Sequence, residues 1–151
     1  MCGVPGAAVR QMLPGDASAV ARLTTELGYP ASEDEIRRRY DLIANRPDAR
    51  LFVAQAGQDV VGWIHVQATC LLECDTRAEI WGLVVGETAR GTGVGRRLVE
   101  AAEQWALMRG LAMMTVRSNR VRTAAHGFYE HLGYTVTKTQ NAFRKHLTTK
   151  T

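Results

Sequence analysis

Apolar positions along the chain repeat with two different periods, and each change of period marks a new element of secondary structure. Two short apolar runs, 80–85 and 111–116, have the length of buried strands. Between them the apolar positions recur every three or four residues, which predicts an amphipathic helix. Its apolar face carries Leu98, Ala101, Ala102, Trp105 and Ala106. A helix of this length suits a crossover, so the three elements predict a parallel β-α-β unit.

The chain before this unit predicts a strand followed by two helices. Residues 8–13 alternate enough for an edge strand. Asp16 is the expected N-cap of the first helix, because an aspartate there accepts hydrogen bonds from free backbone N–H groups. Ser32 and Glu35 have the spacing of a capping box, which predicts that a second helix begins at Ser32.

Strands and loops are predicted on both sides of the central unit. Strands at 51–55 and 60–66 form a hairpin around a glycine-containing turn. The polar segment 69–77 is expected to be a loop that leads to the central strand. After the β-α-β unit we expect a helix at 122–132 and a final pair of strands at 134–137 and 140–145.

A glycine-rich loop at residues 90–95, RGTGVG, joins the 80–85 strand to the helix. Such a loop directs unpaired N–H groups and the positive end of the helix dipole at one spot, which suits a phosphate or pyrophosphate. A dinucleotide fingerprint is excluded because Arg96 stands where its third glycine belongs, and no GK[ST] triplet completes a Walker loop. The alternative is an ordinary β-α turn whose glycines only permit tight packing.

Two separate motifs in this part of the chain resemble those of a known family. The spacing [Q/R]-x-x-G-x-[G/A], filled by Arg90, Gly93 and Gly95, resembles the acetyl-CoA-binding motif of the GNAT superfamily of N-acetyltransferases. Asn119 followed by AAHGFYEHLGY at 124–134 is similar to the family's second cofactor motif. The resemblance implies an α/β (α+β) GNAT fold in a single domain, residues 1–151. Its central mixed, mostly antiparallel sheet would have a parallel β-α-β core and helices on both faces.

The resemblance also implies which residues bind acetyl-CoA as cosubstrate. In the family, the strand before the glycine loop carries a bulge and diverges from its parallel neighbour, so its backbone pairs with pantetheine. The loop amides bind the pyrophosphate, and an asparagine after the next strand bonds pantetheine or substrate. Carried over, the cofactor-binding residues are Leu83, Val84, Val85, Arg90, Gly91, Thr92, Gly93, Val94, Gly95, Arg96 and Asn119.

Glu79 is the candidate general base. It lies eleven positions before Arg90, the offset at which the histone-acetylating branch of the family carries its catalytic glutamate. Strict alternation places Glu79, Trp81 and Leu83 on one face of the strand, and burial beside Trp81 would shift a carboxylate pKa upward. The alternative is a half-exposed strand glutamate that faces a lysine or arginine. Many family members use a water chain in place of a direct base.

Tyr129 matches the family's frequent general acid, which protonates the leaving thiolate. The alternative for this residue is an aromatic side chain on a helix that packs against the sheet. His65 on an alternating strand is expected to be a packing or surface residue. Glu73 and Asp75 are expected to be solvated loop charges, with a role at the acceptor entrance as the alternative.

Composition and charge exclude several other classes of protein. The net charge of +4 is small for a nucleic-acid binder, and the arginines are not interleaved with aromatic residues. Three cysteines are too few for a disulfide framework, and Cys70 and Cys74 lack companions at zinc spacing, so no metal is expected. Without a signal peptide or an apolar run of ~20 residues, the chain is expected in a reducing cytoplasm and not in a membrane.

The resemblance to the GNAT superfamily thus implies an acetyl-CoA-dependent N-acetyltransferase. The acetyl group would pass directly to a primary amine of a small molecule, polyamine-like or aminoglycoside-like, or of a peptide or protein. Acidic side chains near the junction of the first two helices favour a cationic acceptor: Glu26, Glu33, Asp34 and Glu35. A non-catalytic acyl-CoA-binding regulatory module of the same fold is the alternative, and a homodimer is possible from family habit.

Overall fold

The computed structural model describes residues 7–117 and 123–148. The chain divides into two compact units, Met1–Arg117 and Ser118–Thr151, and each is described by itself. The expectation of one domain over the whole chain stays a prediction.

The first unit is built on a five-stranded sheet with the strand order β1-β2-β3-β4-β5. Neighbours β1 to β4 are antiparallel, and β5 runs parallel to β4. The strands are β1 Ala8–Gln11, β2 Ala49–Ala56, β3 Asp59–Leu71, β4 Cys74–Val85 and β5 Met114–Val116. This arrangement confirms the mixed, mostly antiparallel sheet and the parallel β-α-β core.

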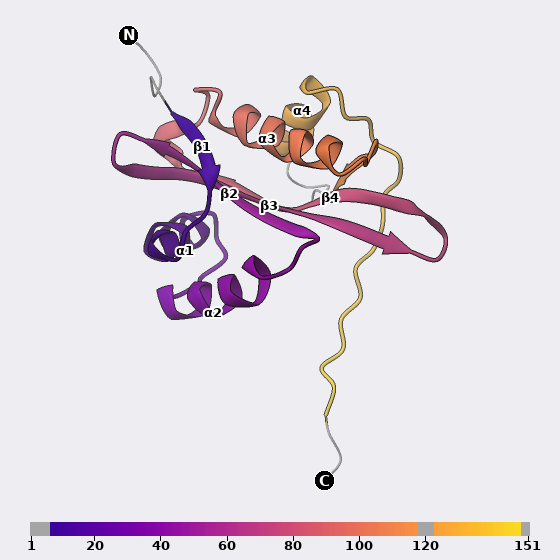
Figure 1. Ribbon diagram of the computed structural model, residues 1–151, viewed down its shortest axis with the longest axis horizontal. Coiled ribbons are helices and arrows are strands. Elements are labelled where there is room, and N and C mark those ends of the chain that lie inside the picture. Colours follow the sequence, from indigo (N-terminus) through magenta and orange to yellow (C-terminus); the bar gives the residue numbers. More distant parts are fainter. Residues whose placement is uncertain (1–6, 118–122, 149–151) are drawn as a thin grey trace. The chain divides into compact units, whose positions relative to one another are not determined.

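Helices cover both faces of this sheet. In Figure 1, α1 (Ala17–Glu26) and α2 (Glu33–Ala44) lie on one side, and α3 (Val94–Met108) lies on the other. The short 3-10 turns η1 (Pro14–Asp16) and η2 (Glu87–Ala89) precede α1 and α3. The face under α1 and α2 is therefore separate from the face that packs on α3.

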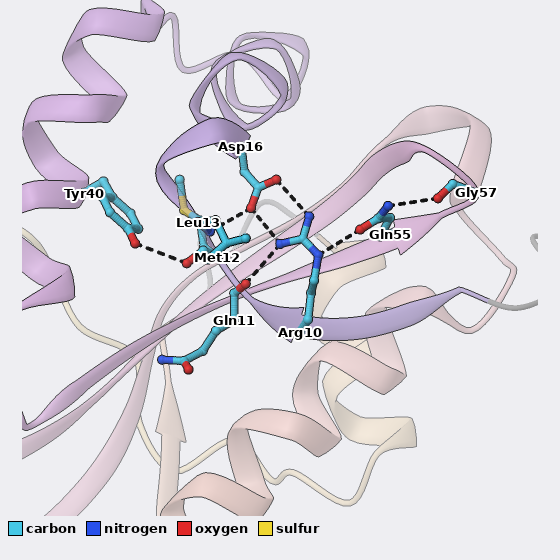
Figure 2. Close-up of polar contacts among 8 residues, drawn as sticks. All are labelled: Arg10, Gln11, Met12, Leu13, Asp16, Tyr40, Gln55 and Gly57. Atoms are coloured by element: carbon cyan, nitrogen blue, oxygen red, sulfur yellow. Dashed lines mark hydrogen bonds and ion pairs between the residues drawn. The ribbon is translucent and has the colours of Figure 1, made fainter.

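The start of α2 confirms the predicted capping box. Ser32 Oγ accepts a hydrogen bond from the Glu35 N–H at 3.1 Å, and Glu35 Oε1 accepts one from the Ser32 N–H at 3.0 Å. Asp16 does occupy the N-cap of α1, but its side chain makes no capping bond to that helix. The carboxylate instead accepts hydrogen bonds from Arg10 and from the Leu13 N–H (Figure 2).

Each face of the sheet has its own apolar core. On the α1 and α2 side, the core includes Met12, Val20, Leu23, Ile36, Val53, Val60 and Val84, with Trp63 packed against it. On the α3 side, a Cβ added to Gly62 would lie 3.0 Å from Leu98 and 3.3 Å from Val94. Glycine at this position lets α3 approach β3 closely. This close packing positions the first turn of α3, which follows the glycine loop, on the sheet.

The predicted loop at 69–77 is wrong, because β3 and β4 continue through it as a long hairpin. Thr69 pairs with Arg77 and Leu71 pairs with Cys74, and only Leu72 and Glu73 form the turn. Ladder hydrogen bonds join backbone groups, so polar side chains are compatible with a strand whose end is exposed to solvent. The predicted 111–116 strand is shorter than expected, since only Met114–Val116 pairs with β4.

The second unit contains α4 (Thr123–His131), close to the predicted helix at 122–132. Gly133, with φ +95°, ends it as expected, and the Tyr134 N–H donates to the Tyr129 carbonyl at 3.0 Å. The two final strands predicted at 134–137 and 140–145 are wrong, because residues 134–148 form no strand. An alternating pattern becomes a strand only when it pairs, and no described strand pairs with this segment.

Candidate active site

The glycine loop between β4 and α3 opens directly into the helix. Gly93 is the N-cap of α3 with φ +88°, and Gly91 has φ +78°, a region that L-residues with a Cβ rarely adopt. The first helical hydrogen bond runs from the Arg97 N–H to the Gly93 carbonyl at 3.1 Å. Within the described ranges, no backbone acceptor bonds the N–H groups of the first three helical residues, 94–96. A row of backbone donors thus stands at the positive end of a 15-residue helix.

The space beside the two glycines of this loop is open. A Cβ added to Gly91 or Gly93 would meet nothing within 4 Å. The Val94 side chain is buried, so of this residue only the backbone could take part in binding. The arginine of the motif, Arg90, donates from Nε to the Val85 carbonyl at 3.3 Å, so it ties the loop to the end of β4. Open space, free donors and a helix N-terminus together fit an anionic group such as a pyrophosphate.

The strand before the loop has an edge that β5 does not cover. β4 pairs with β5 only at Ala78, Glu79 and Ile80, although β4 continues to Val85. Among the described residues, no strand pairs with 81–85 on that side. The predicted pantetheine-binding residues, Leu83, Val84 and Val85, lie on this stretch of β4.

A β-bulge in β4 changes which side chains share a face. Gly82 pairs with His65 and Glu79 pairs with Gln67, so Trp81 is an extra residue in the ladder. The predicted grouping of Glu79 with Trp81 and Leu83 by strict alternation is therefore wrong. Glu79 shares a face with Gly82, because their partners His65 and Gln67 are two residues apart in β3. A Cβ on Gly82 would lie 2.8 Å from the Trp63 ring, which identifies this face as the one packed on α1 and α2.

Glu79 lies buried at this face beside Arg117, one of the arginines that the sequence predicts as partners of a phosphorylated cofactor. The residue is 2% exposed, and Glu79 Oε2 lies 3.4 Å from Arg117 Nε. The Arg117 guanidinium also lies 5.8 Å from the centroid of the Trp81 ring. Glu79 thus faces an arginine, as its alternative interpretation expects, but it is buried and not half-exposed. Arg117 directly follows β5, which pairs with β4 at Glu79. The predicted parallel pairing of these two strands is therefore the signal in the sequence that could have pointed to Arg117 as a partner of Glu79.

His65 and Thr69 are two further polar residues that lie partly buried on β3. Burial lowers the pKa of His65, and Gln67, which shares its face, opposes this effect by hydrogen bonding. No partner among the described residues bonds the buried His65 Nε2 or Thr69 Oγ1. The lowered pKa keeps the imidazole neutral at pH 7.

Tyr129 lies in the second unit, on α4. Its ring makes edge-on contacts with Phe128 and Tyr134, at centroid distances of 5.1 Å and 5.8 Å. Burial raises the pKa of Tyr129 to about 12, so the phenol keeps its proton at neutral pH. Asn119, the other candidate from the second motif, lies outside the described residues.

The described residues form neither a metal site nor a membrane-spanning helix. In the ranges 7–117 and 123–148, no three His, Cys, Asp or Glu side chains gather as a metal site would require. None of the described helices combines the length and apolar character needed to cross a membrane. Glu73 and Asp75 are exposed at the end of the β3–β4 hairpin.

The chain matches a family model and several known proteins. The model of the acetyltransferase (GNAT) family matches residues 18–134. The chain is 32% identical over 89 residues to a streptothricin acetyltransferase from Escherichia coli, which covers 59% of the chain and 49% of that enzyme. It therefore spans about half the length of this curated relative.

Two solved structures have the same fold over nearly all of both chains. One is a Bacillus halodurans protein called a transcriptional regulator, with a TM-score of 0.84, 26% identity, and coverage of 92% of this chain and 99% of that one. The other is an aminoglycoside N-acetyltransferase in complex with CoA, with a TM-score of 0.82, 21% identity, and coverage of 94% and 98%. These likenesses confirm the predicted GNAT fold. Because the family model matches well over half of the chain, the protein belongs to the GNAT family of acetyltransferases.

Proposed function

We propose that this protein transfers an acetyl group from acetyl-CoA directly to a primary amine of a small cationic molecule. The observation that carries the proposal is the row of open amides at the start of α3, next to the stretch of β4 that β5 leaves uncovered. Residues 90–96 would hold the pyrophosphate, and the backbone of Leu83, Val84 and Val85 would pair with pantetheine. The thioester of bound acetyl-CoA would then lie along the uncovered edge of β4.

Glu79 and Tyr129 would manage the protons of this reaction. Acetyl-CoA supplies an activated thioester when bound. The Glu79 carboxylate would take the proton of the acceptor ammonium, directly or through a water, so that the nitrogen lone pair can attack the thioester carbonyl. With its pKa near 12, Tyr129 is protonated at neutral pH and would give its proton to the sulfur as the C–S bond breaks. The proton that the new amide nitrogen loses would restore the phenol through water. Asn119 would hydrogen-bond pantetheine or substrate.

A small-molecule acceptor is favoured over a protein by the names of similar proteins, which act on streptothricin and aminoglycosides. The acidic residues near the helix junction give less support than expected. Glu33 pairs with Arg37, Glu35 caps α2, and Glu26 accepts a hydrogen bond from the Glu87 N–H at 2.7 Å. The electrostatic argument for a cation therefore rests on Asp34 and on Glu79, whose present partner is Arg117.

The alternative is a regulatory module that binds acyl-CoA without turnover, which the name of the Bacillus halodurans neighbour favours. A screen of amines with acetyl-CoA, read as thiol release, separates the two. Acetylation by the wild type that falls at least tenfold in Glu79→Gln would support the proposal. Binding of acetyl-CoA with no release above background for any amine would favour the module. We also propose a reducing cytoplasm as its location, and size measurements in solution would test the homodimer.

A further inference from the structure

We propose that Glu79 and Trp81 form the binding site for the acceptor's reacting ammonium, and that Arg117 occupies this site when no acceptor is bound. The inference rests on the proposed acetyl transfer to an amine. It adds that the protein carries an internal cation in the place of its substrate. Arg117 would thus determine which amines bind and how tightly they bind.

The contacts of Arg117 are those that a bound ammonium would make. Its guanidinium lies 3.4 Å from the Glu79 carboxylate and 5.8 Å from the centroid of the Trp81 ring. A carboxylate and an aromatic face are the two groups that bind organic cations in proteins. One buried carboxylate beside one exposed aromatic ring therefore forms a cation site whose present occupant is a side chain.

The two walls of this site and its occupant differ in exposure and in their place on the sheet. The Glu79 side chain is 3% exposed, and Glu79 is held in the sheet between Gln67 and Thr115. Trp81 lies at the β-bulge and is 50% exposed. A bulge changes the direction in which a side chain points, compared with regular alternation along a strand. The Arg117 side chain is 69% exposed and follows the last residue of β5. Both walls thus belong to β4, and the occupant reaches them from the end of β5.

Arg117 is also held more weakly than an arginine in a structural ion pair. Arg10 approaches Asp16 through two nitrogens, at 2.8 Å and 2.9 Å (Figure 2). The nearest approach of Arg117 to Glu79 is longer, 3.4 Å from Nε to Oε2. An exposed arginine held by one long ion pair and one aromatic contact competes only modestly with a ligand. A cationic acceptor with good geometry can therefore displace it.

The proposal predicts opposite effects of two substitutions on the binding of a cationic probe. Spermidine and neamine are titrated calorimetrically into the full chain saturated with CoA. Arg117→Gln removes the competitor, so binding should tighten roughly threefold to tenfold. Glu79→Gln removes the carboxylate, so binding should weaken at least tenfold. In the double variant, Arg117→Gln should have a much smaller effect than in the wild type, because only the Trp81 ring is then left for Arg117 and the probe to compete for.

Three controls keep the test specific. Arg109 also lies over a tryptophan, at 5.2 Å from the Trp105 centroid, and bonds the Pro47 carbonyl; Arg109→Gln should leave probe binding unchanged. Because Arg117→Gln leaves a buried carboxylate without its cation, thermal unfolding checks its folding. If that variant does not fold, Trp81→Leu decides, since loss of an exposed ring leaves the core intact and should weaken probe binding about threefold.

Several results would overturn the proposal. Weaker or unchanged probe binding in folded Arg117→Gln would do so, as would additive effects in the double variant or unchanged binding in Trp81→Leu. Loss of CoA affinity in Arg117→Gln would identify Arg117 as a phosphate ligand instead, and no probe binding by any variant would remove the site. The proposed function fails separately, if the wild type binds the probes as expected but acetylates no amine.

Discussion

The ion pair between Arg10 and Asp16 is predicted to be the most stabilising polar contact of the N-terminal part of the first unit. Arg10 Nη1 and Nη2 donate to Asp16 Oδ2 and Oδ1 at 2.8 Å and 2.9 Å, and the Leu13 N–H donates to the same carboxylate at 2.8 Å. Arg10 Nε donates to Gln55 on β2 at 2.8 Å. Figure 2 shows how this network joins β1 and β2 to the turn before α1. Asp16 is only 8% exposed, so water replaces its partners poorly.

Asp16→Asn tests the strength of this network. The amide keeps the shape but loses the charge, and its NH2 group turns a donor toward Arg10 or Leu13. Breaking one side of a buried, charge-assisted pair costs about 2–4 kcal/mol of unfolding free energy. For a chain of this size that lowers Tm by roughly 10 °C. Urea and thermal unfolding at pH 7, followed by circular dichroism, measure the change.

Asp48→Asn is the matched control. Arg46 also donates twice to Asp48, at 3.1 Å and 3.1 Å, but this pair is exposed. Exposed pairs contribute little, so the control should unfold close to the wild type. Equal losses in Asp16→Asn and Asp48→Asn would refute the reasoning, because burial would then not be what makes the first pair strong.

The pH dependence of the same comparison follows from the pKa of Asp16. The Arg10 hydrogen bonds lower this pKa, and burial opposes them less strongly. A carboxylate with a lowered folded pKa stabilises the protein above its unfolded pKa and loses that contribution as pH falls through the folded pKa. The difference between wild type and Asp16→Asn should therefore be full at pH 7 and shrink below about pH 4. A difference that grows at low pH would contradict the assignment.

Two further substitutions test the face under α1 and the second unit. Gly82→Ala would place a Cβ 2.8 Å from the Trp63 ring. The substitution should therefore lower the free energy of unfolding in urea by about 1–3 kcal/mol and change the near-UV circular dichroism of tryptophan. An unchanged urea midpoint would contradict this packing. Tyr129→Phe should lower kcat about 100-fold with unchanged CoA affinity, because only the proton donor is removed. A wild-type kcat would remove that role from Tyr129.

The elements that position the site could be predicted because their signals are local. The apolar run at 80–85, the glycines at 91 and 93 and the helical repeat after them each specify backbone conformation within a few residues. Ser32 and Glu35 likewise specify where α2 begins, because both hydrogen bonds of a capping box lie within one helical turn.

What the sequence did not predict depends on pairing between distant segments. The 69–77 segment is polar, yet it is strand because Thr69 and Leu71 find partners across the hairpin. The segments predicted as strands at 134–137 and 140–145 are not strands, because no described strand pairs with them. The bulge at Trp81 reverses the face of Glu79, and one extra residue in a ladder leaves no mark in the hydrophobic pattern. Arg117 reaches Glu79 only through the register of β4 with β5.

Calorimetric titration of acetyl-CoA tests the central claim most directly, with the wild type compared with Gly93→Glu and Gly110→Glu. The two glycines have similar positive φ, +88° and +77°, and a Cβ on either meets nothing within 4 Å, but they lie at opposite ends of α3. We predict micromolar binding by the wild type and by Gly110→Glu, and none by Gly93→Glu, whose carboxylate would repel the pyrophosphate from the open amides. Equal binding by all three proteins, or no binding by the wild type, would contradict the account.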